Sequence, residues 1–224
     1  KQVTQRILCS TAGVDAQMVR KHMHNEGEAQ QLREAQRRLD DAALILVDDT
    51  PSPSPTEVRA KARRYKARHG IGAVVVDYLQ LMRAKGYQSR EQEIAHISRS
   101  LKALGRELGI PIIAMAQLNR ATEDSADKRP SLRNLRESGA IEQDADVVLL
   151  LHRPGYYKRD DPEIKHDAVL IVAKQRNGPI GDIELHFDDR TTTFHSRAVH
   201  SDSAEYAPPI DQADRVQNDA AELF

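Results

Sequence analysis

The sequence predicts an α/β protein with a mostly parallel sheet flanked by helices and closed by an antiparallel flank toward the C-terminus. Three observations favour this fold class. Apolar runs at residues 73–76, 111–116 and 147–151 alternate with helical stretches, as in a parallel sheet. After residue 168 the rhythm changes to closely spaced strands. A turn signal at residues 177–179 separates two of them, which is typical of antiparallel pairing.

The N-terminal part shows helical spacing of apolar side chains on a very polar background. A short strand is then expected at residues 44–47. Next come Ser54, Pro55 and Glu57, which combine an N-cap residue, a proline at the first helical position and a glutamate three residues after the cap. A helix is therefore predicted over residues 55–69, and its many basic residues are interpreted as a solvated face rather than a nucleic-acid surface.

A long helix is expected after the first buried strand, with Gly109 as its stop signal. Its apolar positions are Ile94, Ile97, Leu101, Leu104 and Leu108. A further helical stretch is predicted at residues 132–143, before the run at 147–151. The antiparallel flank is expected to use residues 168–172, 183–187 and 191–194.

Residues 1–197 are expected to form the main domain, and residues 198–224 a mobile tail, because this last part lacks a packable face. The net charge of −1 gives no overall field for a polyanion, so a nucleic-acid contact requires local basic loops. The single cysteine, Cys9, is read as a packing residue and fits a reducing compartment, so we expect a cytoplasmic protein. No apolar run approaches the roughly 18 residues of a membrane span.

Asp77 follows the apolar run at residues 73–76 and offers a carboxylate at the carboxyl end of a buried strand, where α/β proteins bind nucleotides. The phosphate loop G-x-x-x-x-G-K-[ST] needs a glycine directly before lysine, and none of the 11 glycines precedes a lysine. We therefore expect this chain to be part of an ATP-driven protein whose phosphate loop lies outside these residues.

A set of linked segments carries a more specific signal. They are VVVDYLQL at residues 74–81, ISRSLK at 97–102, QLNR at 117–120, LRESGAIEQDAD at 135–146 and KQRNG at 174–178. Together they resemble the motor domain of the DnaB-family replicative DNA helicases over residues 1–194, which implies a RecA-like fold. In that family the phosphate loop, a strand ending in a catalytic glutamate and a separate helical domain would all precede Lys1.

The resemblance implies roles around ATP. Asp77 would hold Mg²⁺, mostly through water, and Gln117 would sense the γ-phosphate with its amide. Lys174 and Arg176 alternate along an extended segment and so project to the same face. They would act catalytically in trans, on the γ-phosphate of the adjacent subunit. Without the resemblance, each residue also has a structural explanation. Asp77 could simply end a strand, and Gln117 could be a polar cap of the next strand. Lys174 and Arg176 could be a basic pair beside a hairpin turn.

Arg136, Glu137 and Gly139 resemble the loop that lines the central channel and holds the backbone of single-stranded DNA. Gly139 would let main-chain N–H groups approach phosphate closely, and Arg136 would supply charge. Glu137 is awkward beside phosphate, so it is expected to position Arg136 or a neighbouring loop.

The intact protein is therefore expected to be a ring-shaped, hexameric, ATP-dependent DNA helicase of replication that uses ATP and Mg²⁺ and moves on single-stranded DNA. Primase and a helicase loader are its expected primosome partners. The chain alone is expected to be inactive. Two alternatives stay open: a noncatalytic binding or assembly module derived from such a helicase, and a RecA-like recombination or regulatory ATPase.

Overall fold

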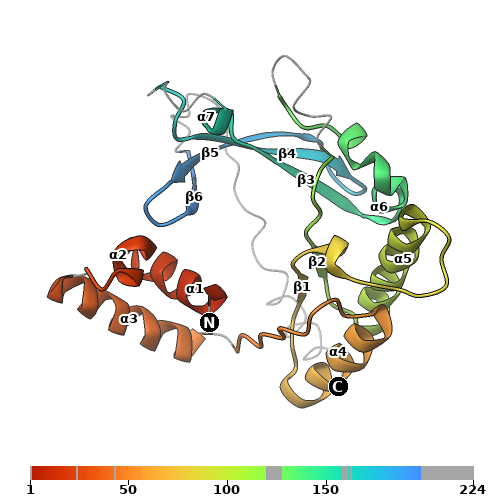
Figure 1. Ribbon diagram of the computed structural model, residues 1–224, viewed down its shortest axis with the longest axis horizontal. Coiled ribbons are helices and arrows are strands. Elements are labelled where there is room, and N and C mark those ends of the chain that lie inside the picture. Colours follow the sequence, from red (N-terminus) through yellow and green to blue (C-terminus); the bar gives the residue numbers. More distant parts are fainter. Residues whose placement is uncertain are drawn as a thin grey trace, which may run out of the picture.

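The computed structural model describes residues 2–23, 25–42, 44–119, 128–157, 161 and 163–197. Figure 1 shows a group of N-terminal helices on one side and an α/β body on the other. The body holds a small two-stranded sheet and a larger four-stranded sheet. The predicted tail at residues 198–224 lies outside the described residues, as does the loop at residues 120–127. None of the described helices is long and apolar enough to cross a membrane.

The predicted N-terminal helices are confirmed as α1 (Gln2–Ala12), α2 (Ala16–Arg20) and α3 (Glu26–Ala42). Helix α1 packs on α3, and Cys9 and Ala35 are buried at 1% and 0% exposure. Cys9 is therefore a packing residue, as its sequence context indicated.

The strand predicted at residues 44–47 is wrong. The segment has no regular secondary structure, and Leu44 and Val47 are exposed at 61% and 59%. Its apolar and β-branched residues favour a strand, but a strand also needs a neighbour with which to pair. No described residue supplies that neighbour.

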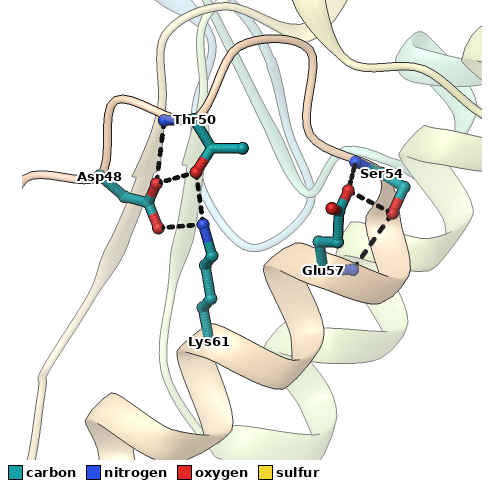
Figure 2. Close-up of polar contacts among 5 residues, drawn as sticks. All are labelled: Asp48, Thr50, Ser54, Glu57 and Lys61. Atoms are coloured by element: carbon teal, nitrogen blue, oxygen red, sulfur yellow. Dashed lines mark hydrogen bonds and ion pairs between the residues drawn. The ribbon is translucent and has the colours of Figure 1, made fainter.

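The chain after this segment is tied to helix α4 (Pro55–His69) by a cluster of polar contacts (Figure 2). Asp48 Oδ2 lies 2.7 Å from Lys61 Nζ, and Lys61 Nζ donates to the Thr50 hydroxyl oxygen at 2.5 Å. The Thr50 hydroxyl in turn donates to Asp48 Oδ1 at 2.6 Å. The hydrogen bond from Lys61 is the largest cause that lowers the pKa of Asp48 to about 2.

Helix α4 begins and ends at the predicted positions. The Ser54 N–H donates to Glu57 Oε2 at 2.7 Å, and the Glu57 N–H donates to Ser54 Oγ at 3.3 Å, which completes the capping box (Figure 2). Gly70 ends the helix with φ of 65°, a left-handed conformation that glycine adopts without steric cost.

Helix α5 (Arg90–Leu108) confirms the predicted long helix and packs beside α4. Gly109 ends it with φ of 62°. On the outer side, Arg59 Nη2 of α4 lies 2.7 Å from Glu107 Oε2, and Arg63 pairs with the same carboxylate. These contacts fit the interpretation of the basic side of α4 as a solvated face.

The first two buried strands are confirmed as β1 (Val74–Val76) and β2 (Ile112–Ala114), which pair in parallel. Between them the chain forms the turn η1 (Leu79–Leu81) and then α5, the crossover that parallel strands require. The core under this unit includes Leu79, Met82, Ile94, Ile97 and Leu101.

The four-stranded sheet is antiparallel throughout, in the order β3-β4-β5-β6. Its strands are β3 (Val147–His152), β4 (Asp167–Gln175), β5 (Gly181–Asp188) and β6 (Thr193–Ser196). The predicted antiparallel flank is confirmed. The prediction that residues 147–151 continue the parallel sheet is wrong, because β3 pairs with β4. A run of apolar residues predicts a strand but carries no information about its direction.

The helical stretch predicted at residues 132–143 is confirmed as a 3₁₀ segment, η3 (Leu132–Ser138), which continues into α6 (Gly139–Asp144). Helix α7 (Pro154–Tyr157) follows β3. Figure 1 shows α6 and α7 at opposite ends of the four-stranded sheet. A second core joins η3 to this sheet through Leu135, Val148, Leu150 and Ile171.

Candidate nucleotide and DNA site

Asp77 and Gln117 follow two neighbouring parallel strands, so both lie at the carboxyl edge of the small sheet, where α/β proteins bind ligands. The strand backbones stay together beyond the sheet. The Met115 N–H donates to the Val76 oxygen at 2.9 Å, and the Leu79 N–H donates to the Met115 oxygen at 2.9 Å. The structure therefore brings together the residues predicted to bind Mg²⁺ and to sense the γ-phosphate.

Gln80 fixes the main chain of Gln117. Its Nε2 donates to the Gln117 oxygen at 3.1 Å, and its Oε1 accepts from the Gln117 N–H at 3.2 Å. Arg90 Nη2 donates to the Gln80 oxygen at 2.7 Å and so holds the turn that carries this amide. Gln80 belongs to the segment that follows Asp77, but no spacing or composition signal distinguishes it from the neighbouring polar residues.

The chain just after Gln117 is bonded to the segment that leads into the predicted DNA site. The Asn119 N–H donates to the Asn134 oxygen at 3.1 Å, and Asn134 lies in η3. The η3 segment leads directly into Gly139, the first residue of α6. The main-chain hydrogen bond between Asn119 and Asn134 thus joins the strand extension that carries Gln117 to this segment.

Lys174, in β4, and Arg176, just after it, both contact the last turn of α6. Lys174 Nζ donates to the Glu142 oxygen at 2.5 Å, and Arg176 Nη2 donates to the Gln143 oxygen at 3.2 Å. Carbonyl groups in the last turn of a helix have no partner within the helix and attract cations. The two cations lie on the same side of β4, as their alternation predicted.

Asp146, between α6 and β3, provides the carboxylate of this cation group. Its Oδ1 lies 3.4 Å from Arg176 Nε, and its main-chain oxygen accepts from the Arg176 N–H at 3.1 Å. Lys102 of α5 donates to Asp146 Oδ2. This hydrogen bond is the largest cause that lowers the pKa of Asp146.

The two groups of predicted site residues lie toward opposite ends of β3. Arg176 is bonded to Asp146, directly before β3, whereas Gln117 lines a cavity of about 570 Å³ together with Leu151 and Arg153 at the carboxyl end. At roughly 3.3 Å per residue, β3 separates these ends by about 17 Å. The structure does not gather Asp77, Gln117, Lys174 and Arg176 around one point of this chain.

The cavity beside Gln117 was not indicated by the sequence analysis. Its lining combines amides, cations and aromatic rings, including Asn119, Lys128, Tyr156 and Tyr157. Lys128 Nζ lies 4.8 Å from the centre of the Tyr157 ring. The Arg153 guanidinium lies 3.4 Å from the centre of the Phe187 ring, and burial lowers the pKa of Arg153.

The described residues leave the DNA-binding prediction partly open. The side chains of Arg136 and Glu137 are not among those described, so their predicted roles remain predictions. Gly139 has φ of −50° and ψ of −25°, an ordinary helical conformation that does not require glycine. A Cβ at this position would meet no described atom within 4 Å apart from its chain neighbours and the backbone of its own helix. Open space on this side is what close approach of a nucleic-acid backbone needs.

Asp77 is an exposed single carboxylate at the sheet edge. Mg²⁺ keeps several of its waters and is held in nucleotide sites by one or two carboxylates and the phosphates, so a single acid fits it. Among the described residues, no group of three or more His, Cys, Asp or Glu side chains could form a site held by protein alone.

A parallel β-α-β unit with an acid and an amide at its carboxyl edge, beside an antiparallel sheet, defines a RecA-like fold of the kind found in helicase ATPase domains. The family described as DnaB-like helicase C terminal domain matches residues 1–196, and the chain belongs to this family.

The replicative DNA helicase DnaB of Geobacillus stearothermophilus is 43% identical over 210 residues, which are 93% of this chain and 46% of that protein. The replicative DNA helicase DnaC of Bacillus subtilis (strain 168) is 40% identical over 210 residues, with the same shares. The chain thus spans less than half the length of these curated relatives.

Two solved structures have the same fold. One, described as an ATPase domain, is similar with a TM-score of 0.78 and 34% identity, over 86% of this chain and 69% of that chain. A DnaB-like replicative helicase, described together with its interactions with primase, is similar with a TM-score of 0.80 and 35% identity. That match covers 87% of this chain and 48% of the other.

Proposed function

We propose that this chain is the motor part of a ring-shaped, ATP-dependent replicative DNA helicase, a hexamer that moves on single-stranded DNA and unwinds the duplex at the fork. The separation of Arg176 from Gln117 along β3 is the observation that supports this most. It is the arrangement expected when one subunit binds ATP and the next supplies the cation that promotes hydrolysis.

At the nucleotide edge, Asp77 would hold Mg²⁺, mostly through water, and Gln117 would donate its amide to the γ-phosphate. Mg²⁺, when held there, would supply positive charge to the phosphates. The hydrogen bonds of Gln80 keep the Gln117 main chain in register with the turn after Asp77. The phosphate loop motif is absent from these 224 residues, so the intact helicase would supply it from another part of its sequence.

Lys174 and Arg176 serve the ATP held by the neighbouring subunit. Charge spreads over the oxygens of the phosphoryl group during transfer, so a cation placed there lowers the barrier. Such a residue contributes roughly 10³ to 10⁵ in rate, which corresponds to about 4 to 7 kcal/mol. The half-exposed Arg176 side chain, at 48%, can reach a partner surface.

The DNA strand is held by Arg136 and by the main chain near Gly139, with Glu137 orienting this segment. Loss of the γ-phosphate releases Gln117, and the hydrogen bond from Asn119 to Asn134 carries this change into η3. Contacts with phosphates are independent of base sequence, as a moving motor requires. The solved relative described with primase supports primase as a partner, and a helicase loader is a further expected partner.

The test uses the full-length protein that contains this chain. We expect it to hydrolyse Mg-ATP, to respond to single-stranded DNA and to unwind a forked duplex. Asp77→Asn should abolish hydrolysis and unwinding while the ring still forms. Asp167→Asn, an acid at the start of β4, is the matched control and should leave all three unchanged. A wild-type ring that binds DNA without hydrolysing ATP would instead support the noncatalytic module.

Calorimetry separates the chain from the intact protein. The 224-residue chain should bind Mg-ATP weakly or not at all, because its sequence lacks the phosphate loop that provides the main phosphate ligands. The full-length protein should bind it tightly. Micromolar or tighter binding by the chain alone would mean that the phosphate site lies elsewhere in these residues.

A further inference from the structure

Asp146 lies where four segments meet. It follows α6, precedes β3 and faces α5 through the bond from Lys102. It also contacts Arg176, the residue that follows β4, through both its carboxylate and its main-chain oxygen. Asp146 is therefore the carboxylate that lies against the cation proposed to act in trans.

The contacts define the orientation of the Arg176 guanidinium. Nε faces the Asp146 carboxylate at 3.4 Å, and Nη2 donates to the Gln143 oxygen at 3.2 Å. Both contacts are on one edge of a planar group that carries five N–H donors in a rigid fork. The Nη1 donors take no part in either contact, so they are left to bind a phosphate of another subunit.

We propose that Asp146 is a positioning residue for Arg176, and that Lys102 in turn holds the Asp146 carboxylate. The inference rests on the proposed function, because it concerns how the Arg176 guanidinium is oriented toward the ATP of the neighbouring subunit. An arginine side chain has many rotamers, and rates of phosphoryl transfer depend steeply on placement: an error of about 1 Å can cost roughly 10²-fold. A fixed carboxylate removes that freedom before the neighbouring ATP arrives.

The same contacts tie the cation to the DNA segment. Helix α6 has only 6 residues, and Gly139 begins it while Gln143 holds Arg176 near its end. At about 1.5 Å per residue, roughly 6 Å of helix separates these two residues. A shift of the η3 segment when DNA binds would therefore move the carbonyl acceptor of Arg176. Asp146 would make the guanidinium move together with α6.

Asp146 is a suitable position for substitution. Its side chain is 59% exposed, and exposed ion pairs contribute little to stability, so a variant should fold. The matched control is Asp167, which also pairs with an arginine, Arg197, at 3.3 Å. Asp167 begins β4 and Arg176 follows its end, so this control makes the same chemical change at the far end of the same strand.

The experiment compares Asp146→Ala, Asp146→Asn and Asp167→Ala in the full-length ring, with ATP hydrolysis measured with and without single-stranded DNA. We expect Asp146→Ala to lower kcat roughly 10- to 100-fold and to leave KM for Mg-ATP within about twofold, since ATP is held by the other subunit. Asp146→Asn keeps an acceptor oxygen and should fall between Asp146→Ala and wild type. Asp167→Ala should behave as wild type.

A double substitution tests whether the effect passes through the cation. In an Arg176→Ala background, Asp146→Ala should lower the residual rate by less than about twofold, because the positioned group is gone. If Asp146→Ala lowered the rate 10- to 100-fold in the Arg176→Ala protein as well, the inference would be overturned. Mixed rings give a second test: Asp146→Ala subunits should regain activity with Asp77→Asn subunits, which carry an intact Asp146 and Arg176. They should not regain it with Arg176→Ala subunits.

The result also separates this inference from the proposed function. If wild type hydrolyses ATP and Arg176→Ala does not, but Asp146→Ala keeps the wild-type kcat, the positioning role is wrong while the motor assignment stands. If the wild-type ring shows no hydrolysis, the proposed function fails and the positioning role fails with it.

Discussion

The side chain of Gln80 pairs with the main chain of Gln117 through two hydrogen bonds, one donated at 3.1 Å and one accepted at 3.2 Å. A side-chain amide thereby takes the place of a neighbouring strand at the point where the small sheet ends. The turn that follows Asp77 and the extension that carries Gln117 are consequently bonded to each other. A nucleotide site at this edge needs such a constraint, because the strands themselves stop before the site residues.

The first prediction concerns this pair. In the full-length protein, Gln80→Ala should lower kcat for ATP hydrolysis about 10-fold, because each neutral hydrogen bond is worth about 0.5–1.5 kcal/mol and Gln117 loses two. KM should change little. Gln92→Ala, which removes an amide on the outer side of α5, is the control. An unchanged kcat in Gln80→Ala would show that the pairing does not hold the sensor.

A second prediction tests action between subunits. Arg176→Ala should lower kcat by roughly 10³ to 10⁵ and leave ATP binding largely in place, since the side chain acts on a neighbour's transition state. Rings mixed from Arg176→Ala and Asp77→Asn subunits should regain part of the activity, because some interfaces then join an intact Asp77 to an intact Arg176. Absence of recovery despite demonstrated mixing would indicate action within one subunit.

A third prediction concerns DNA. Arg136→Ala should weaken binding of single-stranded DNA by the ring about equally for different base sequences. It should also reduce the salt dependence, by about 0.7 in the slope of log K against log salt for each lost phosphate contact. Hydrolysis without DNA should survive, while its stimulation by DNA should fall.

The control for Arg136 is Arg197→Ala, which makes the same change in net charge beside Asp167 at the start of β4. Its salt slope should match wild type. If Arg136→Ala also keeps the wild-type slope, the channel segment lies elsewhere, and the basic helix with Arg59 and Arg63 becomes the next candidate.

The fourth prediction concerns pH. The pKa of Asp48 is lowered to about 2, so the Asp48–Lys61 contact stabilises the fold above about pH 4 and is lost as pH falls from about 4 toward 2. Lys61→Met should raise this pKa toward its ordinary value, as measured by carboxyl NMR. It should lower the free energy of unfolding at neutral pH by about 1 kcal/mol, the upper range for a partly exposed pair. Lys85→Met should change neither quantity.

Local signals in the sequence predicted the helices well. The capping box of Ser54 and Glu57 and the left-handed glycines Gly70 and Gly109 each act within one turn of chain, so residue order alone reveals them. Strand pairing is not local. The apolar run at residues 44–47 lacks a neighbour among the described residues, and β3 pairs with β4 rather than with β2. Neither outcome is encoded in the runs themselves.

The candidate site divides in the same way. The meeting of Asp77 and Gln117 follows from the rule that parallel strands end at one edge, so the sequence predicted it. The roles proposed for Gln80 and Asp146 depend on contacts with residues 37 and 30 positions away. A single polar residue gives no sign of such a partner before the chain is folded.

The placement of Arg176 and Gln117 toward opposite ends of β3 has a consequence for stoichiometry. Under the proposed arrangement, one subunit cannot complete its own catalytic site. An open row of subunits contains one complete site fewer than its number of members, whereas a closed ring contains as many sites as members. The ATPase activity per subunit would therefore depend on how completely the subunits have assembled. On dilution this activity should fall at protein concentrations where each subunit still binds its nucleotide.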